Sequence, residues 1–311
     1  MAVLKVIMLG DVVGEPGLSA LEKQLPALRE EYQAALITVN GENAAGGFGM
    51  TETELRRILA AGADAVSSGN HIWEKRDFWP VLESETRVVR PANYPEGNPG
   101  RGWTKIEAQG AVFILVNIQG REFMPHTDCP FRTMDRLLAL DEFGAALPSP
   151  NVRDSSPDAR DASPDSPPAA PVSEQAANSE PESTKPEGRK PFILVDFHAE
   201  AAQEKEALAF YLDGRVSLLA GTHTHVQTAD ERVLPKGTGY ITDLGMTGPG
   251  GSIIGMDKKI CLDRSRTQIL YRMECADGGG TIQGIAAELD SRSGRALSII
   301  RINRPNTPFP L

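Results

Sequence analysis

The sequence predicts an α/β fold, and three observations support that class. Short apolar runs of strand length alternate with longer segments whose apolar residues recur at helical spacing. Several of these runs stop abruptly at glycine-flanked polar residues, as strands of an α/β sheet do where a loop begins. The C-terminal part instead alternates strand-like runs with polar turns, which predicts antiparallel strands that close the fold.

Three strand–loop–helix units come first along the chain. Predicted strands cover residues 3–9, 35–39 and 63–67, and helical segments follow over residues 19–32, 51–61 and 73–83. At the second helix Glu54 follows Thr51 by three residues, which predicts a capping box. The three strands end at polar residues that can bind a metal ion, namely Asp11, the pair Glu42 and Asn43, and the pair Asn70 and His71.

The rest of the chain continues this pattern around one interruption. We expect a loop over residues 91–110, strands over 111–118, 192–198, 217–220 and 240–245, helices over 131–146 and 201–211, and antiparallel strands over 268–273, 280–289 and 297–302. Residues 148–191 are dominated by Pro, Ser, Asp, Glu and Ala, and such a segment buries too little apolar surface to offset its ordering entropy. We therefore expect one domain over residues 1–311, with a disordered or poorly packed insertion at 148–191.

The charge and the apolar runs limit the partners. The formal net charge is -10 and the pI is near 5.1, which argues against binding to duplex nucleic acid through its phosphate backbone. No apolar run approaches the roughly 20 residues that span a bilayer, and the N-terminal run is too short for a signal peptide. The three cysteines have no metal-type spacing and predict reduced thiols. We expect a cytoplasmic protein without a membrane partner. The sequence does not decide between a monomer and a homo-oligomer.

Histidines mark the ends of the predicted strands. Four of the five lie there, namely His71, His198, His223 and His225, whereas His126 lies in a Pro-rich loop. In extended backbone, residues two apart point to the same face, so His223 and His225 would aim at one point just past a buried strand.

The combined donors predict a centre with two metal ions. Nitrogen and oxygen donors without cysteine suit Mn, Fe, Zn or Mg. The set is larger than one four-coordinate ion needs, and two ions about 3.5–4 Å apart would use all of it, with the Glu42 carboxylate as the candidate bridge. We expect the loops at the carboxyl edge of a single sheet to bring this set of side chains together: Asp11, Glu42, Asn43, Asn70, His71, His198, His223 and His225.

Simpler roles are open to each residue taken alone. Asp11 could cap the following helix, an asparagine such as Asn43 could form a turn, and His198 could lie satisfied in the core. Phe48 and Trp73 could stack on a nucleobase or pack in the core. The recurrence of metal-competent clusters at successive strand ends favours a metal centre over so many independent coincidences.

The motifs, in their order, resemble those of calcineurin-like metallophosphoesterases. They are Gly10-Asp11, Gly41-Glu42-Asn43, Gly69-Asn70-His71, an isolated His198, and Gly221-Thr222-His223-Thr224-His225. Two departures, Val13 where the superfamily has a histidine and Glu42 where it has an aspartate, resemble the bacterial YmdB family. The stretches 195–200 and 243–249 are similar to that family as well. The resemblance covers essentially the whole chain except the insertion.

The resemblance implies a four-layer α/β/β/α metallophosphoesterase sandwich with two metal ions, iron or manganese before zinc or magnesium. One ion would be bound by Asp11, Glu42, Asn43 and His225, and the other by Glu42, Asn70, His198 and His223. The implied activity is a phosphodiesterase that hydrolyses a small phosphorylated substrate, a 2′,3′-cyclic nucleotide such as 2′,3′-cyclic AMP. Attack would come from a hydroxide that bridges the two ions.

His71 is the candidate general acid. The leaving alkoxide needs a proton, and histidine as a residue type is suited to donate one near neutral pH. Because Asn70 is assigned to the metal, its neighbour would lie over the substrate; a further ligand or a supporting group are the alternatives for His71. For the whole protein the alternatives are a phosphomonoesterase or protein phosphatase, or a regulatory scaffold that keeps the metallophosphoesterase fold.

Overall fold

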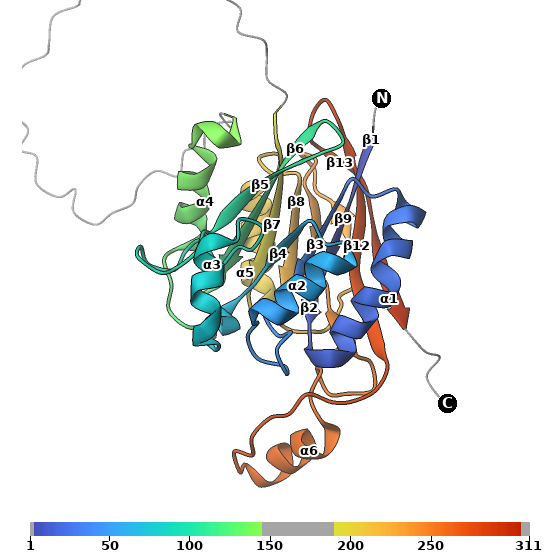
Figure 1. Ribbon diagram of the computed structural model, residues 1–311. Coiled ribbons are helices and arrows are strands. Elements are labelled where there is room, and N and C mark those ends of the chain that lie inside the picture. Colours follow the sequence, from blue (N-terminus) through green and yellow to red (C-terminus); the bar gives the residue numbers. More distant parts are fainter. Residues whose placement is uncertain (1–2, 145–189, 306–311) are drawn as a thin grey trace, which may run out of the picture. The chain divides into compact units, whose positions relative to one another are not determined.

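The computed structural model describes residues 3–144 and 190–305, which form two β-sheets and the helices that cover them (Figure 1). These residues belong to one compact unit. The predicted insertion at 148–191 lies outside the described residues except for its last two. Within the described ranges, no helix is both long enough and apolar enough to cross a membrane.

The first sheet has seven strands within the described residues. They are β1 (Val3–Leu9), β2 (Asp11–Val12), β3 (Leu36–Asn40), β4 (Ala65–Ser67), β11 (Met246–Pro249), β12 (Gly280–Asp290) and β13 (Ala296–Pro305). β1, β3 and β4 run parallel, and β12 pairs antiparallel with both β1 and β13. Because β1, β3 and β4 point the same way, their carboxyl ends share one edge of the sheet.

The second sheet has six strands within the described residues. They are β5 (Trp103–Ala108), β6 (Ala111–Gln119), β7 (Phe192–His198), β8 (Leu218–Thr222), β9 (Arg232–Val233) and β10 (Gly239–Ile241). The inner four, β6, β7, β8 and β10, run parallel, and the edge strands β5 and β9 pair antiparallel with them. β7 and β8 are buried along their whole length, as expected for parallel strands covered on both faces.

Helices pack on the outer face of each sheet, which gives four layers. They are α1 (Gly14–Tyr32), α2 (Glu52–Ala61), α3 (Trp79–Ser84), α4 (Pro130–Leu138) and α5 (Ala202–Leu212). Ile7 of β1 packs with α1 and α2, and Leu219 of β8 packs with α4 and α5. Met8 and Leu194 point the opposite way from their sheets and meet in a core between the two sheets. The predicted α/β/β/α sandwich is therefore confirmed.

The predicted loop over residues 91–110 contains the edge strand β5. Pro and Gly crowd the start of this segment, but Trp103–Ala108 alternates, with Lys105 and Glu107 facing solvent. The backbone of this segment finds its hydrogen-bond partners in β6, with which it pairs antiparallel. The local sequence alone does not indicate this pairing. Charged side chains on an edge strand also limit pairing with other chains.

Three further elements differ from the prediction. Residues 268–273 form no strand, because Leu270 is 85% exposed and faces solvent without a neighbouring strand. They follow α6 (Lys258–Thr267), a largely polar helix that apolar periodicity did not reveal. The predicted helix over 73–83 is divided into the single-turn 3-10 helices η1 (Asn70–Trp73) and η2 (Arg76–Phe78), followed by α3. The predicted helix over 131–146 ends at Leu138, and the 3-10 turn η3 (Asp141–Phe143) follows it.

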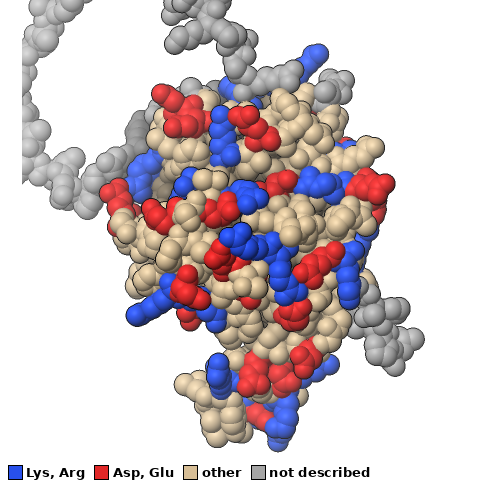
Figure 2. Space-filling model, viewed as in Figure 1, with Lys and Arg blue, Asp and Glu red and all other residues tan. Residues whose placement is uncertain are grey.

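Charged residues of both signs are interspersed on the face shown in Figure 2. The described residues form no broad basic surface on that face, in keeping with the net charge of -10.

The capping box predicted at α2 is present and gives a test of the local structure. The backbone N of Thr53 donates to Oγ1 of Thr51 at 3.3 Å, and the backbone N of Thr51 donates to Oε2 of Glu54 at 3.0 Å. We expect Thr51→Ala to lower the free energy of unfolding by about 1 kcal/mol, measured by urea denaturation.

Thr53→Ala is the matched control, because Thr53 lies exposed in the same turn and its side chain caps nothing. Its free energy of unfolding should stay within about 0.5 kcal/mol of the unchanged protein. Equal losses in the two variants would contradict a specific capping role for Thr51.

Candidate metal centre

The predicted ligands lie at the carboxyl ends of strands from both sheets. The first sheet and the loops after its strands supply Asp11, Glu42, Asn43 and Asn70, and the second sheet supplies His198, His223 and His225. The expectation of a single sheet edge is therefore wrong. Because the two sheets pack face to face, their carboxyl edges meet, and loops from both reach the same place.

The imidazole of His198 lies at the centre of one group of donors. Its Nε2 atom is 3.0 Å from Oε1 of Glu42, 3.0 Å from Oδ1 of Asn70 and 3.0 Å from Nδ1 of His223. Donor atoms of Glu42, His198 and His223 all lie within 4.8 Å of one another. One imidazole nitrogen carries at most one proton and cannot satisfy so many neighbours, whereas a cation placed among them can.

Asn43 and His225 form a second group beside the first, and Asp11 adjoins the first group, since its Oδ2 atom accepts the backbone N of His223 at 3.0 Å and its Oδ1 atom lies 3.9 Å from Nδ1 of His198. Nδ2 of Asn43 lies 3.1 Å from Oε1 of Glu42 and 3.1 Å from Nε2 of His225. Oδ1 of Asp11 and Oδ1 of Asn43 are buried without a hydrogen-bond partner among the described residues. Buried oxygens without partners are costly, and a bound cation would satisfy them. Glu42 contacts both groups, as a bridging carboxylate must.

Burial and mutual proximity set the charge of the cluster. Burial raises the pKa of Asp11 to about 7, although nearby histidines oppose this. Burial opposes protonation of His198, but Glu42, Asp11 and Asp196 outweigh it and raise the pKa of His198 to about 9. Burial, together with His198, lowers the pKa of His223 to about 3. The carboxylates thus attract positive charge to the point where the donors converge, which is the environment that a metal cation requires.

Asp196 determines which nitrogen of His198 faces the cluster. Oγ1 of Thr222 donates to Oδ1 of Asp196 at 2.6 Å and lies 3.0 Å from Nδ1 of His198. Asn40 and Ser67 donate to Oδ2 of the same carboxylate. With its own hydrogen directed at Asp196, the Thr222 oxygen accepts the Nδ1 proton of His198. In the neutral imidazole that a metal ion binds, the Nε2 lone pair therefore faces the cluster.

A buried ion pair holds the loop that follows β8. Nζ of Lys205, on α5, lies 2.7 Å from Oδ2 of Asp243, and both side chains are buried. The same carboxylate accepts the backbone N of Thr224 at 3.2 Å and the backbone N of Gly245 at 2.8 Å. The pair thereby connects a helix of the outer layer to the loop that carries two of the predicted ligands.

The two histidines of that loop do not continue the strand. β8 ends at Thr222, and φ is 97° at His223 and 64° at His225. Such values are costly for residues other than glycine and persist only where the surroundings hold them. The prediction that both share one face of an extended strand is therefore wrong. Instead His223 reaches His198, and His225 reaches Asn43.

His71 lies at the rim of the cluster. Its backbone N donates to Oε2 of Glu42 at 3.2 Å, and its side chain is 27% exposed. Its Nδ1 atom lies 3.5 Å from Oε1 of Glu74, and the ring of Phe48 meets it edge-on, with the centroids 5.3 Å apart. This position brings a partly exposed imidazole next to the buried donors. Trp73, by contrast, packs edge-on against other aromatic rings and joins the core beneath α1 and α2.

Sequence reasoning missed several residues that hold the site. Oε2 of Glu200 lies 3.2 Å from Nε2 of His223. Thr222 lies within the Gly221–His225 motif but was given no role, and nothing in the local sequence marks Lys205, which acts through a contact that crosses the fold. Only Glu200 carried a signal, since it follows His198 by two residues at the end of a strand.

Comparisons with known proteins agree over nearly the whole chain. A family model described as "YmdB-like protein" matches residues 7–145 and 173–302. A 2′,3′-cyclic-nucleotide 2′-phosphodiesterase of Bacillus subtilis is 39% identical over 299 residues, which are 96% of this chain and 96% of that protein. A crystal structure of a hypothetical protein from Thermus thermophilus matches with a TM-score of 0.76 and 38% identity, covering 98% of this chain and 100% of that one. A structure described as a novel phosphatase from Mycoplasma pneumoniae matches with a TM-score of 0.79 and 28% identity, covering 99% and 96%.

Gly69 offers a test of how closely the donors pack. A methyl group at this position would lie 2.2 Å from Oε2 of Glu42 and 2.3 Å from Nε2 of His198. Relieving that overlap costs about 1–3 kcal/mol, which corresponds to roughly tenfold to hundredfold weaker metal binding. We expect Gly69→Ala to show this loss in a metal titration followed by calorimetry.

Gly251→Ala is the matched control, because nothing lies within 4 Å of an added methyl group there. It should bind metal as tightly as the unchanged protein. Full metal affinity in Gly69→Ala would show that the donor cluster is looser than described here, or that metal binds elsewhere.

The buried ion pair predicts a large effect on stability. Lys205→Met leaves the carboxylate of Asp243 buried without its cationic partner, and such changes cost about 3–5 kcal/mol. We expect that loss in the free energy of unfolding from urea denaturation. The double variant Lys205→Met/Asp243→Asn removes both charges and should recover part of it. A single variant as stable as the unchanged protein would rule out a structural role for the pair.

Proposed function

This chain belongs to the YmdB-like family and is a hydrolase of the metallophosphoesterase type, and we propose that it is a metal-dependent phosphodiesterase of 2′,3′-cyclic nucleotides. The family match and the Bacillus subtilis relative support the class of reaction and the substrate. The observation that carries the proposal is the convergence of donors on Nε2 of His198, next to two buried oxygens without partners.

The proposed ligands divide between two metal ions. Asp11, Asn43 and His225 would bind one ion, Asn70, His198 and His223 would bind the other, and Glu42 would bridge them. The contacts of Glu42 with both groups support this division. We propose iron or manganese, as the family resemblance implies, and nitrogen and oxygen donors without a thiolate agree with either metal. When bound, the two ions supply Lewis-acid stabilisation of the phosphoryl oxygens and lower the pKa of water at the site.

The residues of the chain would position and protonate the reactants. Asp196 and Thr222 keep the lone pair of Nε2 of His198 directed at the cluster. His71, at the rim, would donate a proton to the oxygen that leaves when the P–O bond breaks. Its partly exposed ring beside the buried donors supports that role, since a general acid must reach both solvent and the bound substrate.

Removing the metal tests the proposal directly. We expect the purified protein to hydrolyse 2′,3′-cyclic AMP, to lose that activity after chelation and to regain it when manganese or iron is restored. Asp11→Asn should lose both bound metal and activity. Faster hydrolysis of a phosphomonoester such as p-nitrophenyl phosphate than of 2′,3′-cyclic AMP would instead favour a phosphomonoesterase, in line with the relative described as a phosphatase.

The role of His71 is tested separately from metal binding. General acid catalysis contributes about 10²–10⁴-fold, so His71→Ala should lower kcat by that factor and leave the metal content unchanged. His126→Ala is the control, because His126 lines a separate cavity together with Arg121 and Phe131. If His71→Ala lost metal together with activity, His71 would be a ligand or a support for one.

A further inference from the structure

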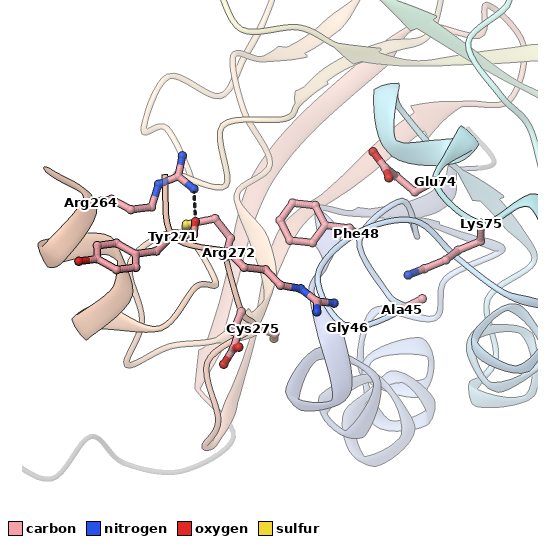
Figure 3. A pocket seen from close by; sticks show the side chains of 11 residues that line it. Ala45, Gly46, Phe48, Glu74, Lys75, Arg264, Tyr271, Arg272 and Cys275 are labelled. Atoms are coloured by element: carbon pink, nitrogen blue, oxygen red, sulfur yellow. Dashed lines mark hydrogen bonds between the residues drawn. The ribbon is translucent and has the colours of Figure 1, made fainter. Parts of the chain in front are cut away.

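A cavity of about 710 Å³ lies next to His71, because Phe48 and Glu74, which both contact His71, line it (Figure 3). Its volume is within the range of small-molecule binding sites. Three segments line it: the loop after β3 with Gly46 and Phe48, the segment after η1 with Lys75, and α6 and the residues after it with Arg264, Tyr271 and Arg272. The first segment also carries the predicted ligands Glu42 and Asn43, and the second follows Asn70, yet none of the seven ligands lines this cavity. A group bound here is therefore separate from the group bound at the metal ions.

Two cationic side chains extend into the cavity from opposite sides. Figure 3 shows the ammonium group of Lys75 and the guanidinium group of Arg272 directed toward its middle. Neither of them forms a salt bridge with any residue that the structure describes. Like charges that converge without a counter-ion repel each other, and an anion between them would relieve this repulsion. The net charge of the chain is -10, so the two cations at this cavity do not simply reflect a basic surface.

The other charged side chains that line the cavity are Arg264, Glu74 and Glu274. Nη1 of Arg264 donates to the backbone O of Tyr271 at 2.7 Å, which holds the segment after α6 in place. The carboxylate of Glu74 lies toward His71, 3.5 Å from its Nδ1 atom, and points away from the space between Lys75 and Arg272 (Figure 3).

Phe48 connects the cavity with the proposed general acid. Its ring lines the cavity and also meets the ring of His71 edge-on at 5.3 Å. An aromatic ring at this place offers a base or a ribose an apolar surface, and stacking on such rings is tolerant of base identity. A ligand bound here can therefore extend toward His71, the proposed proton donor.

We propose that this cavity binds a second phosphate of the substrate, one carried on the 5′-oxygen of the nucleoside whose 2′,3′-cyclic phosphate lies at the metal ions. The proposal rests on the proposed function. A simple cyclic mononucleotide has one phosphate and leaves Lys75 and Arg272 without a partner. The preferred substrate class is thus a 2′,3′-cyclic nucleotide with a further 5′-phosphate, either a mononucleotide or the end of a short single-stranded oligonucleotide.

The test compares three substrates: 2′,3′-cyclic AMP, its 5′-phosphorylated form, and a dinucleotide that ends in a 2′,3′-cyclic phosphate. We expect kcat/KM to rise about tenfold or more for the second and third, because a charge-assisted contact forms with each cationic side chain. Equal gains for the two would identify the 5′-phosphate alone as the recognised group. A larger gain for the dinucleotide would identify the oligonucleotide end. No gain for either compound overturns the proposal.

Variants assign the gain to the cavity. Lys75→Ala and Arg272→Ala should each reduce the gain several-fold, leave hydrolysis of 2′,3′-cyclic AMP nearly unchanged, and flatten the dependence of log KM on log salt by about 0.7. Arg266→Ala is the matched control, since it removes an exposed positive charge from α6, the helix that precedes Arg272, and Arg266 does not line the cavity. A loss of the gain in Arg266→Ala equal to that in Arg272→Ala would show a general charge effect and overturn the proposal.

A binding measurement separates this proposal from the proposed function. Isothermal titration of the three compounds into metal-loaded His71→Ala protein reports affinity without turnover. We expect the two compounds with a 5′-phosphate to bind more tightly, and this difference should disappear in a protein that also carries Lys75→Ala. That result supports phosphate binding in the cavity even if the unchanged protein hydrolyses none of the compounds. Equal affinity for all three compounds overturns it, whatever the activity.

Discussion

The contact between Glu42 and His198 is the constraint on which the rest of the structure depends. One residue follows a strand of the first sheet and the other ends a strand of the second, and their side chains meet at 3.0 Å with no exposed surface. This contact requires the two sheets to keep one relative position. The apolar core between them, which includes Met8 and Leu194, supplies that rigidity.

Bringing charged and polar groups together in this way is costly unless each is satisfied. Two sets of contacts hold these groups in place. Asp196 and Thr222 orient His198, and the ion pair of Lys205 with Asp243 holds the loop after β8. Some oxygens stay without partners even so. A metal-binding site requires donor side chains that other residues hold in place and whose inward-facing atoms lack hydrogen-bond partners. A bound ion then becomes the partner of those atoms.

The departure at Val13 fits the same account. Where the wider superfamily resembled by this chain has a histidine, Val13 is buried in an apolar cluster with Met246, Met256 and Cys261. Phe48 packs against this cluster and also lines the cavity that Lys75 and Arg272 enter. The absence of a histidine at position 13 thus accompanies an apolar cluster that supports Phe48, whose ring also meets that of His71.

The sequence by itself determined the alternation of strands and helices, the four-layer class through its resemblance, and the residue types at the strand ends. These follow from apolar periodicity and from glycine-flanked polar clusters, which are local properties of the chain. It missed β5 and α6 and predicted a strand at 268–273, because edge strands and polar helices depend on partners rather than on local pattern. Only the tertiary structure decided that the seven side chains come from two sheets, that His223 and His225 leave the extended conformation, and that Thr222, Glu200 and Lys205 support them. The physical reason is that all three features depend on contacts between strand ends that are distant in the sequence. Packing between the two sheets determines which strand ends come into contact.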